Sequence, residues 1–222
     1  MKKTIRVVTS LLALLALLVS LPICAMAEDY DGSEPISGNV DTYTGKHSNV
    51  TEEGSVTTNQ GQIDTNMGTV ENNTSVRDET SKTGFNVNTG RIKLNNGTVS
   101  KNGAAGSYYS GLVWENQALK SEDGTSYQEG TGVVENNYGC IFISGDENAT
   151  TADSATVVDN HGYIYCNYGT VKDNEETGLI DFNGYQSVIE NNNAGLITKN
   201  FGIVNSNSGT ITKNNCNYSV AM

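Results

Sequence analysis

A seven-residue repeat constrains the fold of this chain more than any other feature. From residue 54 onward the sequence returns to the pattern Gly-x-[Val/Ile]-x-x-Asn-x, first as GSVTTN at 54–59 and then as GQIDTN at 61–66. Degenerate units occupy several gaps between the strict ones. The strict units begin at Gly54, Gly61, Gly68, Gly90, Gly97, Gly111, Gly132, Gly162, Gly169, Gly178, Gly195, Gly202 and Gly209. A three-position pattern that recurs this often indicates a repeat architecture.

A period of seven is also typical of coiled coils, but the residues of this repeat exclude that structure. A coiled coil needs two apolar positions per heptad on strong helix formers, whereas each unit here has one β-branched residue, one Gly and one Asn. Val and Ile among Thr, Ser and Tyr favour short strands, and Gly with Asn favours sharp corners. Each unit is therefore predicted to be a short strand followed by a corner.

A single short strand cannot bury its one Val or Ile, but stacked equivalent strands bury all of them in a continuous column. The repeat therefore predicts an all-β, single-stranded parallel β-helix, or β-solenoid, and we expect a right-handed coil. Three units per coil, about 22 residues, give a triangular section with layers about 4.8 Å apart. Two units per coil give a flatter and longer roll. Uninterrupted runs of three units, at 54–74, 155–175 and 195–215, favour the triangle.

The repeated asparagines are predicted to be structural. Each lies three residues after the aliphatic position, where its amide can bond its own corner and the next coil as a ladder. Such a side chain contributes about 1 kcal/mol when paired and costs roughly 1–3 kcal/mol when it is buried unpaired. The residues assigned this role are Asn59, Asn66, Asn137, Asn174, Asn200 and Asn207.

The Gly-x-[Val/Ile]-x-x-Asn repeat resembles those of secreted and surface-exposed bacterial parallel β-helix proteins of the adhesin-like kind. The resemblance covers about three quarters of the chain and implies the solenoid fold, a bacterial source and a place at the cell surface. The repeat is also similar to the heptads of a plant ice-binding β-roll. In those heptads Asn, Val and Gly recur in a different order.

Four segments lie outside the repeat. Residues 1–27 combine basic residues, an apolar stretch and Ala-Met-Ala at 25–27, which predicts a cleaved secretory signal peptide and no transmembrane segment afterwards. The acidic stretch 28–53 is expected to be a flexible leader or an N-terminal cap to a solenoid over 54–215. Residues 118–131 interrupt the heptads and predict a loop insertion. The short tail, 216–222, offers little cover for an open end, so end-to-end self-association is a further expectation.

Composition excludes some classes of function. The formal net charge of -12 disfavours nucleic acid as a partner, because phosphate binding needs a basic face. The mature chain would hold Cys140, Cys166 and Cys216, which leaves open one disulfide with a free thiol or three reduced thiols. Their spacing has no CxxC and predicts no metal site, and no cofactor motif occurs.

Aromatic residues are the best candidates for a binding surface. If several point outward on one face, they would form a stacking platform for sugar rings or a partner protein; cross-layer packing is the structural alternative. The residues we select are Tyr108, Tyr109, Trp114, Tyr138, Tyr163 and Tyr168.

The sequence therefore predicts a secreted or cell-surface, non-catalytic solenoid that is adhesin-like or structural and binds a surface glycan or a host protein. The alternative is a polysaccharide lyase or hydrolase on the same scaffold, which would need two facing carboxylates. The acids at Asp64, Glu71, Asp159, Asp173 and Asp181 are instead spread over outward positions. Ice binding would need a regular Thr array, and the residue after each unit Gly is too variable for one.

Overall fold

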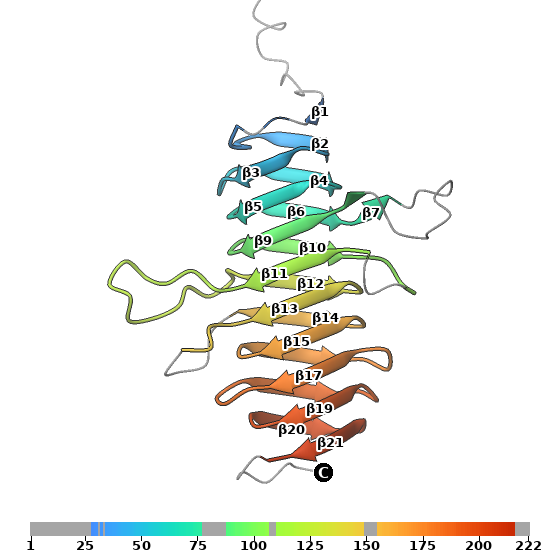
Figure 1. Cartoon of the computed structure of the whole chain (residues 1–222). Helices are drawn as coiled ribbons and strands as arrows, with labels where there is room; N and C mark the ends of the chain where they lie inside the picture. The colour runs from blue at the N-terminus through green and yellow to red at the C-terminus, as the bar shows by residue number, and fades with distance from the viewer. Residues whose placement is uncertain are drawn as a thin grey trace, which may run out of the picture.

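The computed structural model describes residues 28–30, 32, 34–76, 88–106, 110–148 and 155–215. The predicted signal peptide, Tyr108, Tyr109 and the tail 216–222 lie outside these residues. All regular elements of the described part are strands, which stack into one elongated solenoid (Figure 1). No helix there is long and apolar enough to cross a membrane.

The strands form two parallel sheets. Sheet A contains, in spatial order, β1 (Glu28–Tyr30), β2 (Asn39–Tyr43), β4 (Ser55–Asn59), β6 (Thr69–Asn73), β10 (Thr98–Asn102), β12 (Val133–Asn137), β14 (Thr156–Asn160), β16 (Thr170–Asn174), β18 (Val188–Asn192) and β20 (Ile203–Asn207). Sheet B contains β3 (Lys46–Val50), β5 (Gln62–Asn66), β9 (Arg91–Asn95), β11 (Leu112–Asn116), β13 (Cys140–Ser144), β15 (Tyr163–Asn167), β17 (Leu179–Asn183), β19 (Leu196–Asn200) and β21 (Thr210–Asn214). A small antiparallel pair consists of β7 (Ser75–Val76) and β8 (Asn88–Thr89).

The β-solenoid is confirmed, but the three-sided coil of about 22 residues is wrong. Successive strands alternate between the two sheets, so one coil contains two repeat units. Asn59 and Asn73, which are 14 residues apart, occupy equivalent positions in adjacent coils. The physical reason lies in the core, because two aliphatic side chains facing each other fill the roughly 10 Å between packed sheets.

The core is one aliphatic residue per strand, taken from the second strand position. Sheet A contributes mainly valines and sheet B mainly isoleucines, and almost all are 0–1% exposed. In sheet A these include Val56, Val70, Val99, Val134, Val157, Val171, Ile189 and Val204, and in sheet B Ile63, Ile92, Val113, Ile141, Ile164, Ile180 and Ile197. Pairing a smaller with a larger residue fills the interior, which supplies the main apolar stabilisation of the fold.

The predicted asparagine ladder is confirmed, and there is one in each sheet. In sheet A each Nδ2 donates to the Oδ1 of the next coil at 2.6–2.8 Å, in an unbroken series. The series runs through Asn59, Asn73, Asn102, Asn137, Asn160, Asn174, Asn192 and Asn207. In sheet B the corresponding ladder is interrupted at Ser144. Side-chain amides can be buried here because each is paired along the axis.

The unit glycines are required by the close stacking of the corners. A Cβ at Gly97 would overlap the carbonyl oxygen of Gly68 in the preceding coil, and a Cβ at Gly139 would overlap that of Gly111 in the same way. A larger residue would therefore have to push the coils apart at the corner.

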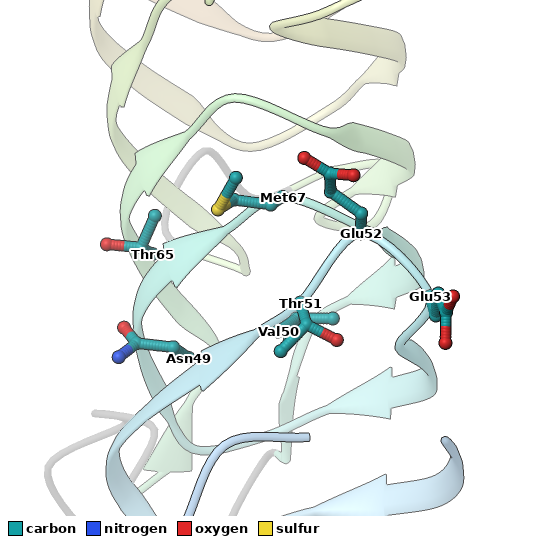
Figure 2. A pocket seen from close by; sticks show the side chains of 7 residues that line it. All are labelled: Asn49, Val50, Thr51, Glu52, Glu53, Thr65 and Met67. Carbon is teal, nitrogen blue, oxygen red and sulfur yellow. The ribbon is translucent and has the colours of Figure 1, made fainter. Parts of the chain in front are cut away.

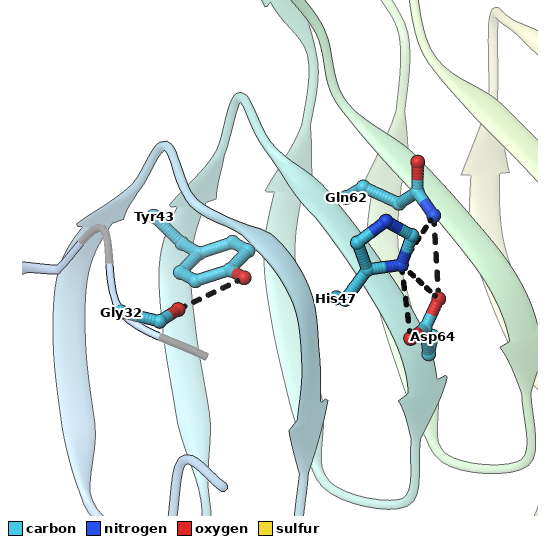
Figure 3. Close-up of polar contacts among 5 residues, drawn as sticks. All are labelled: Gly32, Tyr43, His47, Gln62 and Asp64. Atoms are coloured by element: carbon cyan, nitrogen blue, oxygen red, sulfur yellow. Dashed lines mark hydrogen bonds and ion pairs between the residues drawn. The ribbon is translucent and has the colours of Figure 1, made fainter. Parts of the chain in front are cut away.

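The solenoid extends toward the N-terminus beyond the strict repeat. The segment 28–53 contributes β1, β2 and β3, and it places Ile36, Tyr43 and Val50 in the core. Tyr43 and Val50 occupy the ladder positions of the first coil, and the Tyr43 hydroxyl donates to the carbonyl of Gly32 at 3.3 Å (Figure 3). The described residues of this segment therefore continue the two sheets of the coils.

The segment 118–131 connects β11 to β12 and projects from the side of the stack (Figure 1). Asp146 lies in the turn after β13, in the following coil, and anchors this loop to the stack. Its carboxylate pairs with Lys120 at 2.9 Å and accepts a hydrogen bond from the Tyr127 hydroxyl at 3.0 Å.

Candidate functional site

The outer face of sheet A is polar. The first residue of its strands is mostly Ser, Thr or Val, and the third residue includes Glu71, Glu135, Lys172 and Glu190. The first strand position, which follows the unit Gly, is therefore more regular within sheet A than it is along the sequence, where units of the two sheets alternate. Ice binding would need a flat double array of threonines, and the charged residues at the third position exclude one on this face.

The outer face of sheet B is apolar in its middle. Apolar residues occupy most of the first, third and fourth positions of β11, β13, β15 and β17, with Glu115 and Asp181 as the exceptions, and the registers place equivalent positions side by side. We call this surface the aromatic face, defined by Leu112, Trp114, Phe142, Tyr163, Tyr165 and Leu179, with the buried Cys140 between Leu112 and Tyr163. Contiguous apolar surface of this kind marks interaction sites on proteins.

Three aromatic rings form a column at the centre of the aromatic face. Trp114, Phe142 and Tyr165 are the third residues of β11, β13 and β15. The rings of Trp114 and Phe142 stack with centroids 4.4 Å apart, and those of Phe142 and Tyr165 are 6.4 Å apart and tilted. Trp114 is 48% exposed and Tyr165 is 47% exposed. Because strands β11, β13 and β15 are held on both sides, these rings form a rigid platform.

A hollow of about 170 Å³ adjoins the Trp114 end of the column. Gln62, Arg91, Ile92, Lys93, Leu112 and Trp114 line it, all from β5, β9 and β11. Phe142 lies on the opposite side of the Trp114 ring, so one face of the indole is stacked and the other adjoins the hollow.

The structure brings together only some of the residues selected from sequence. Trp114 and Tyr163 lie on the aromatic face, and the Tyr163 ring contacts Tyr165 edge-on at 6.4 Å. Burial, and then the charge of Asp181, raise the pKa of Tyr163, so its hydroxyl stays protonated at neutral pH.

Tyr138 and Tyr168 lie at opposite corners, away from the column. Tyr138 is in an A-to-B corner, where its ring stacks on His161 at 4.8 Å and Lys101 lies 5.6 Å from its centroid. Tyr168 is in a B-to-A corner and contacts Phe182 at 6.0 Å. The packing interpretation therefore suits these two tyrosines better than a binding role.

Phe142 and Tyr165 are not among the binding residues predicted from the sequence. The signal that finds them is their distance from the unit glycine, because Trp114, Phe142 and Tyr165 each follow that Gly by three residues. Residues with the same offset form a column along one sheet once alternate units are assigned to it.

The thiols of the described chain are poor nucleophiles. Cys140 and Cys166 are free and lie on adjacent strands, three positions out of register. Burial raises the pKa of Cys140 to about 11, and burial followed by the charge of Asp181 raises that of Cys166. Both thiols are therefore protonated at neutral pH, which disfavours their use in covalent catalysis or metal binding.

A larger hollow, of about 520 Å³, lies at the corner after β3 and contains acids but no aromatic ring. Glu52 and Glu53 line it together with Met67, and Figure 2 shows the two carboxylates turned in different directions. The hollow therefore lacks a facing carboxylate pair. Among the described residues there is also no cluster of three His, Cys, Asp or Glu that could hold a metal ion.

Two acids do lie side by side on sheet A. Asp159 of β14 is in register with Asp173 of β16, and Asp173 accepts hydrogen bonds from Asn191 and Asn193 at 3.0 and 3.1 Å. Both carboxylates project from the same sheet surface in adjacent coils. The two amide partners of Asp173 fit a structural role for that residue.

A third polar group lies at the N-terminal end of sheet B. The Nδ1 of His47 is 3.3 Å from Asp64 Oδ2, and Gln62 Nε2 lies within 3.2–3.3 Å of both side chains (Figure 3). This exposed group links β3 to β5 and holds the Asp64 carboxylate toward His47.

No protein-family model, no curated protein and no solved structure matches the chain.

Proposed function

We propose that the protein is a secreted or cell-surface, non-catalytic β-solenoid of a bacterium, adhesin-like in character, that binds a glycan through the aromatic face. The observation that carries this proposal is the column of Trp114, Phe142 and Tyr165, with two rings about half exposed on an otherwise acidic protein.

The chemistry of the face favours a sugar over an apolar peptide. Aromatic side chains combine an apolar surface with polar groups, here the Trp114 indole N–H and the tyrosine hydroxyls, and sugars present the same combination. Gln62 and Lys93 line the hollow at the Trp114 end of the column, and Asp181 follows Tyr165 at its other end, so these side chains can bond sugar hydroxyls. The rigid two-sheet core reduces the entropy cost of binding, because few side chains have to be ordered.

Export is the second part of the proposal, and its support is the N-terminal sequence. The basic residues, apolar stretch and Ala-Met-Ala at 25–27 have the form of a secretory signal. A glycan-binding surface on an exported solenoid would contact polysaccharides of other cells or of a host. End-to-end association of solenoids stays a prediction.

The test is co-sedimentation of the purified protein with a panel of insoluble polysaccharides and mucins. The matched variants are Trp114→Ala/Tyr165→Ala on sheet B and Lys172→Ala/Glu190→Ala on the outer face of sheet A. We expect the wild type and the sheet A variant to sediment with at least one polysaccharide, and the sheet B variant to remain in the supernatant. Equal sedimentation of both variants, or no binding to any of the panel, would overturn the proposal. Binding to mucin that survives removal of its glycans would point instead to a protein partner.

An enzyme remains the second candidate because Asp159 and Asp173 are neighbours in register. The same supernatants can be assayed for new reducing ends. Release that disappears in Asp159→Asn and Asp173→Asn would establish the enzyme and refute the non-catalytic assignment, whereas binding without release supports it.

A further inference from the structure

The aromatic column has two ends that differ in chemistry. At its Tyr165 end, the next residue of the column is Asp181 of β17. At its Trp114 end, the next residue is Lys93 of β9, with Arg91 on the same strand, and the 170 Å³ hollow separates these cations from the indole. The free face of Trp114 thus adjoins the positive end.

Arg91 and Lys93 are available to a ligand. Both side chains are exposed, and neither has an ion-pair partner within the part of the chain that the structure describes. The nearest acid in the column, Asp64, is held by His47 and Gln62 at 3.3–3.4 Å. Other exposed cations of the described chain also lack an ion-pair partner, among them the in-register pair Lys199 and Lys213. Arg91 and Lys93 differ from these because they line a hollow beside an exposed indole, and on a protein with a net charge of -12 this placement points to an anionic ligand.

We infer that the glycan of the proposed function contains a carboxylated sugar, whose ring stacks on the free face of Trp114 and whose carboxylate binds Arg91 and Lys93. This inference rests on the proposed function and names the class of its ligand. The guanidinium of Arg91 suits a carboxylate, because its planar donors match the two oxygens. The indole supplies the apolar contact and the orientation of the ring.

The net charge restricts the ligand further. A densely charged polyanion would be repelled by the net negative charge of the protein, whereas one carboxylate in a neutral oligosaccharide needs only the two cations that line the hollow. The neutral part of the chain would lie along Phe142 and Tyr165. The expected ligand is therefore a mostly neutral glycan with isolated uronic or sialic acid residues.

Isothermal titration with matched probe pairs tests this inference. One pair is a glucuronosyl-substituted xylotriose and plain xylotriose, and the other is 3′-sialyllactose and lactose. We expect the acidic member of one pair to bind about tenfold or more tightly than its neutral partner, as a charge-assisted hydrogen bond would give. The pair that responds distinguishes a uronic acid from a sialic acid. The preference should decline with added salt.

The charge of the hollow is tested by Arg91→Gln/Lys93→Gln, with Lys172→Gln on sheet A as the control. The double variant should lose the acidic preference and the control should keep it. Equal binding of acidic and neutral probes, or an unchanged preference in the double variant, would overturn the inference and leave the proposed function standing. If no probe binds and no polysaccharide sediments the protein, both fail together.

Discussion

Asn167 lies directly next to Ser144 in the register of β15 and β13, and its side-chain oxygen receives no hydrogen bond from the described residues. The Oδ1 of Asn66 is unpaired in the same way, because Val50 occupies the ladder position before it. The other asparagine oxygens of this ladder are reached from the preceding coil, as Asn95 Oδ1 is by Asn66 at 2.8 Å. The serine is too short for this. Asn116 reaches Ser144 Oγ only at 3.4 Å, and the hydroxyl does not extend to Asn167.

Replacing the serine should repair the ladder. Ser144→Asn restores a donor for Asn167 and an acceptor for Asn116, so we expect the free energy of unfolding to rise by about 1–2 kcal/mol. Chemical denaturation measures this change. The same replacement at the exposed Ser206 is the control, and an equal gain there would show that the ladder is not its source.

Removing an amide from the intact ladder should do the opposite. Asn137→Ala removes the ladder acceptor of Asn102 Nδ2, which keeps only a 3.4 Å contact with the Cys140 carbonyl, and the ladder donor of Asn160 Oδ1. Both asparagines are fully buried. Unpaired buried groups cost about 1–3 kcal/mol each, so we expect a loss of at least about 2 kcal/mol in thermal or denaturant unfolding. Asn205→Ala, on the exposed surface of β20, should change stability little.

The corner glycines should tolerate no side chain. In Gly97→Ala the new methyl group meets the Gly68 carbonyl, and separation of the two coils should cost about 1–3 kcal/mol. Gly38→Ala makes the same change where nothing lies within 4 Å, and it should be close to neutral. Equal effects of the two replacements in a melting experiment would contradict the close stacking.

The projecting loop should loosen in acid. The hydrogen bond from Lys120, and then that from the Asn148 backbone, hold the pKa of Asp146 below its usual value of 3.8. Because this pKa is lowered in the folded protein, the ionised Asp146 stabilises the loop fully above pH 3.8. The stabilisation is lost as the pH falls through the lowered pKa. Protease cleavage within 118–131 should therefore increase below about pH 4, and Asp146→Asn should raise it already at neutral pH. A loop that is equally resistant in the variant would exclude the anchor.

The strand-and-corner unit could be predicted from local preferences, because Val and Ile favour strands whereas Gly and Asn favour corners. The number of units per coil could not be read from uninterrupted runs of three. The core residues contain part of this information, since sheet A contributes mainly valines and sheet B mainly isoleucines, with Val113 and Ile189 as exceptions. This distribution reflects which sheet each residue belongs to, a property of packing across the core.

The candidate site shows the same limit. Aromatic composition predicted a platform, and Trp114 and Tyr163 belong to it, but Tyr138 and Tyr168 precede the unit glycine and therefore lie in corners. The hollow beside Trp114 depends on Arg91 and Lys93 lying one coil away. The register of β9 and β11 places these cations beside Trp114. In the sequence the two strands are separated by β10, which belongs to sheet A, so their proximity is not evident there.

The most direct test of glycan binding at the aromatic face uses Trp114, which is the single tryptophan of the chain. A soluble fragment of any polysaccharide that sediments the protein is titrated while the tryptophan emission is recorded. We predict a saturable change in emission, with the same midpoint as binding measured by calorimetry and with much weaker binding in Tyr165→Ala. Saturable binding that leaves the emission of Trp114 unchanged would place the glycan elsewhere and contradict the account.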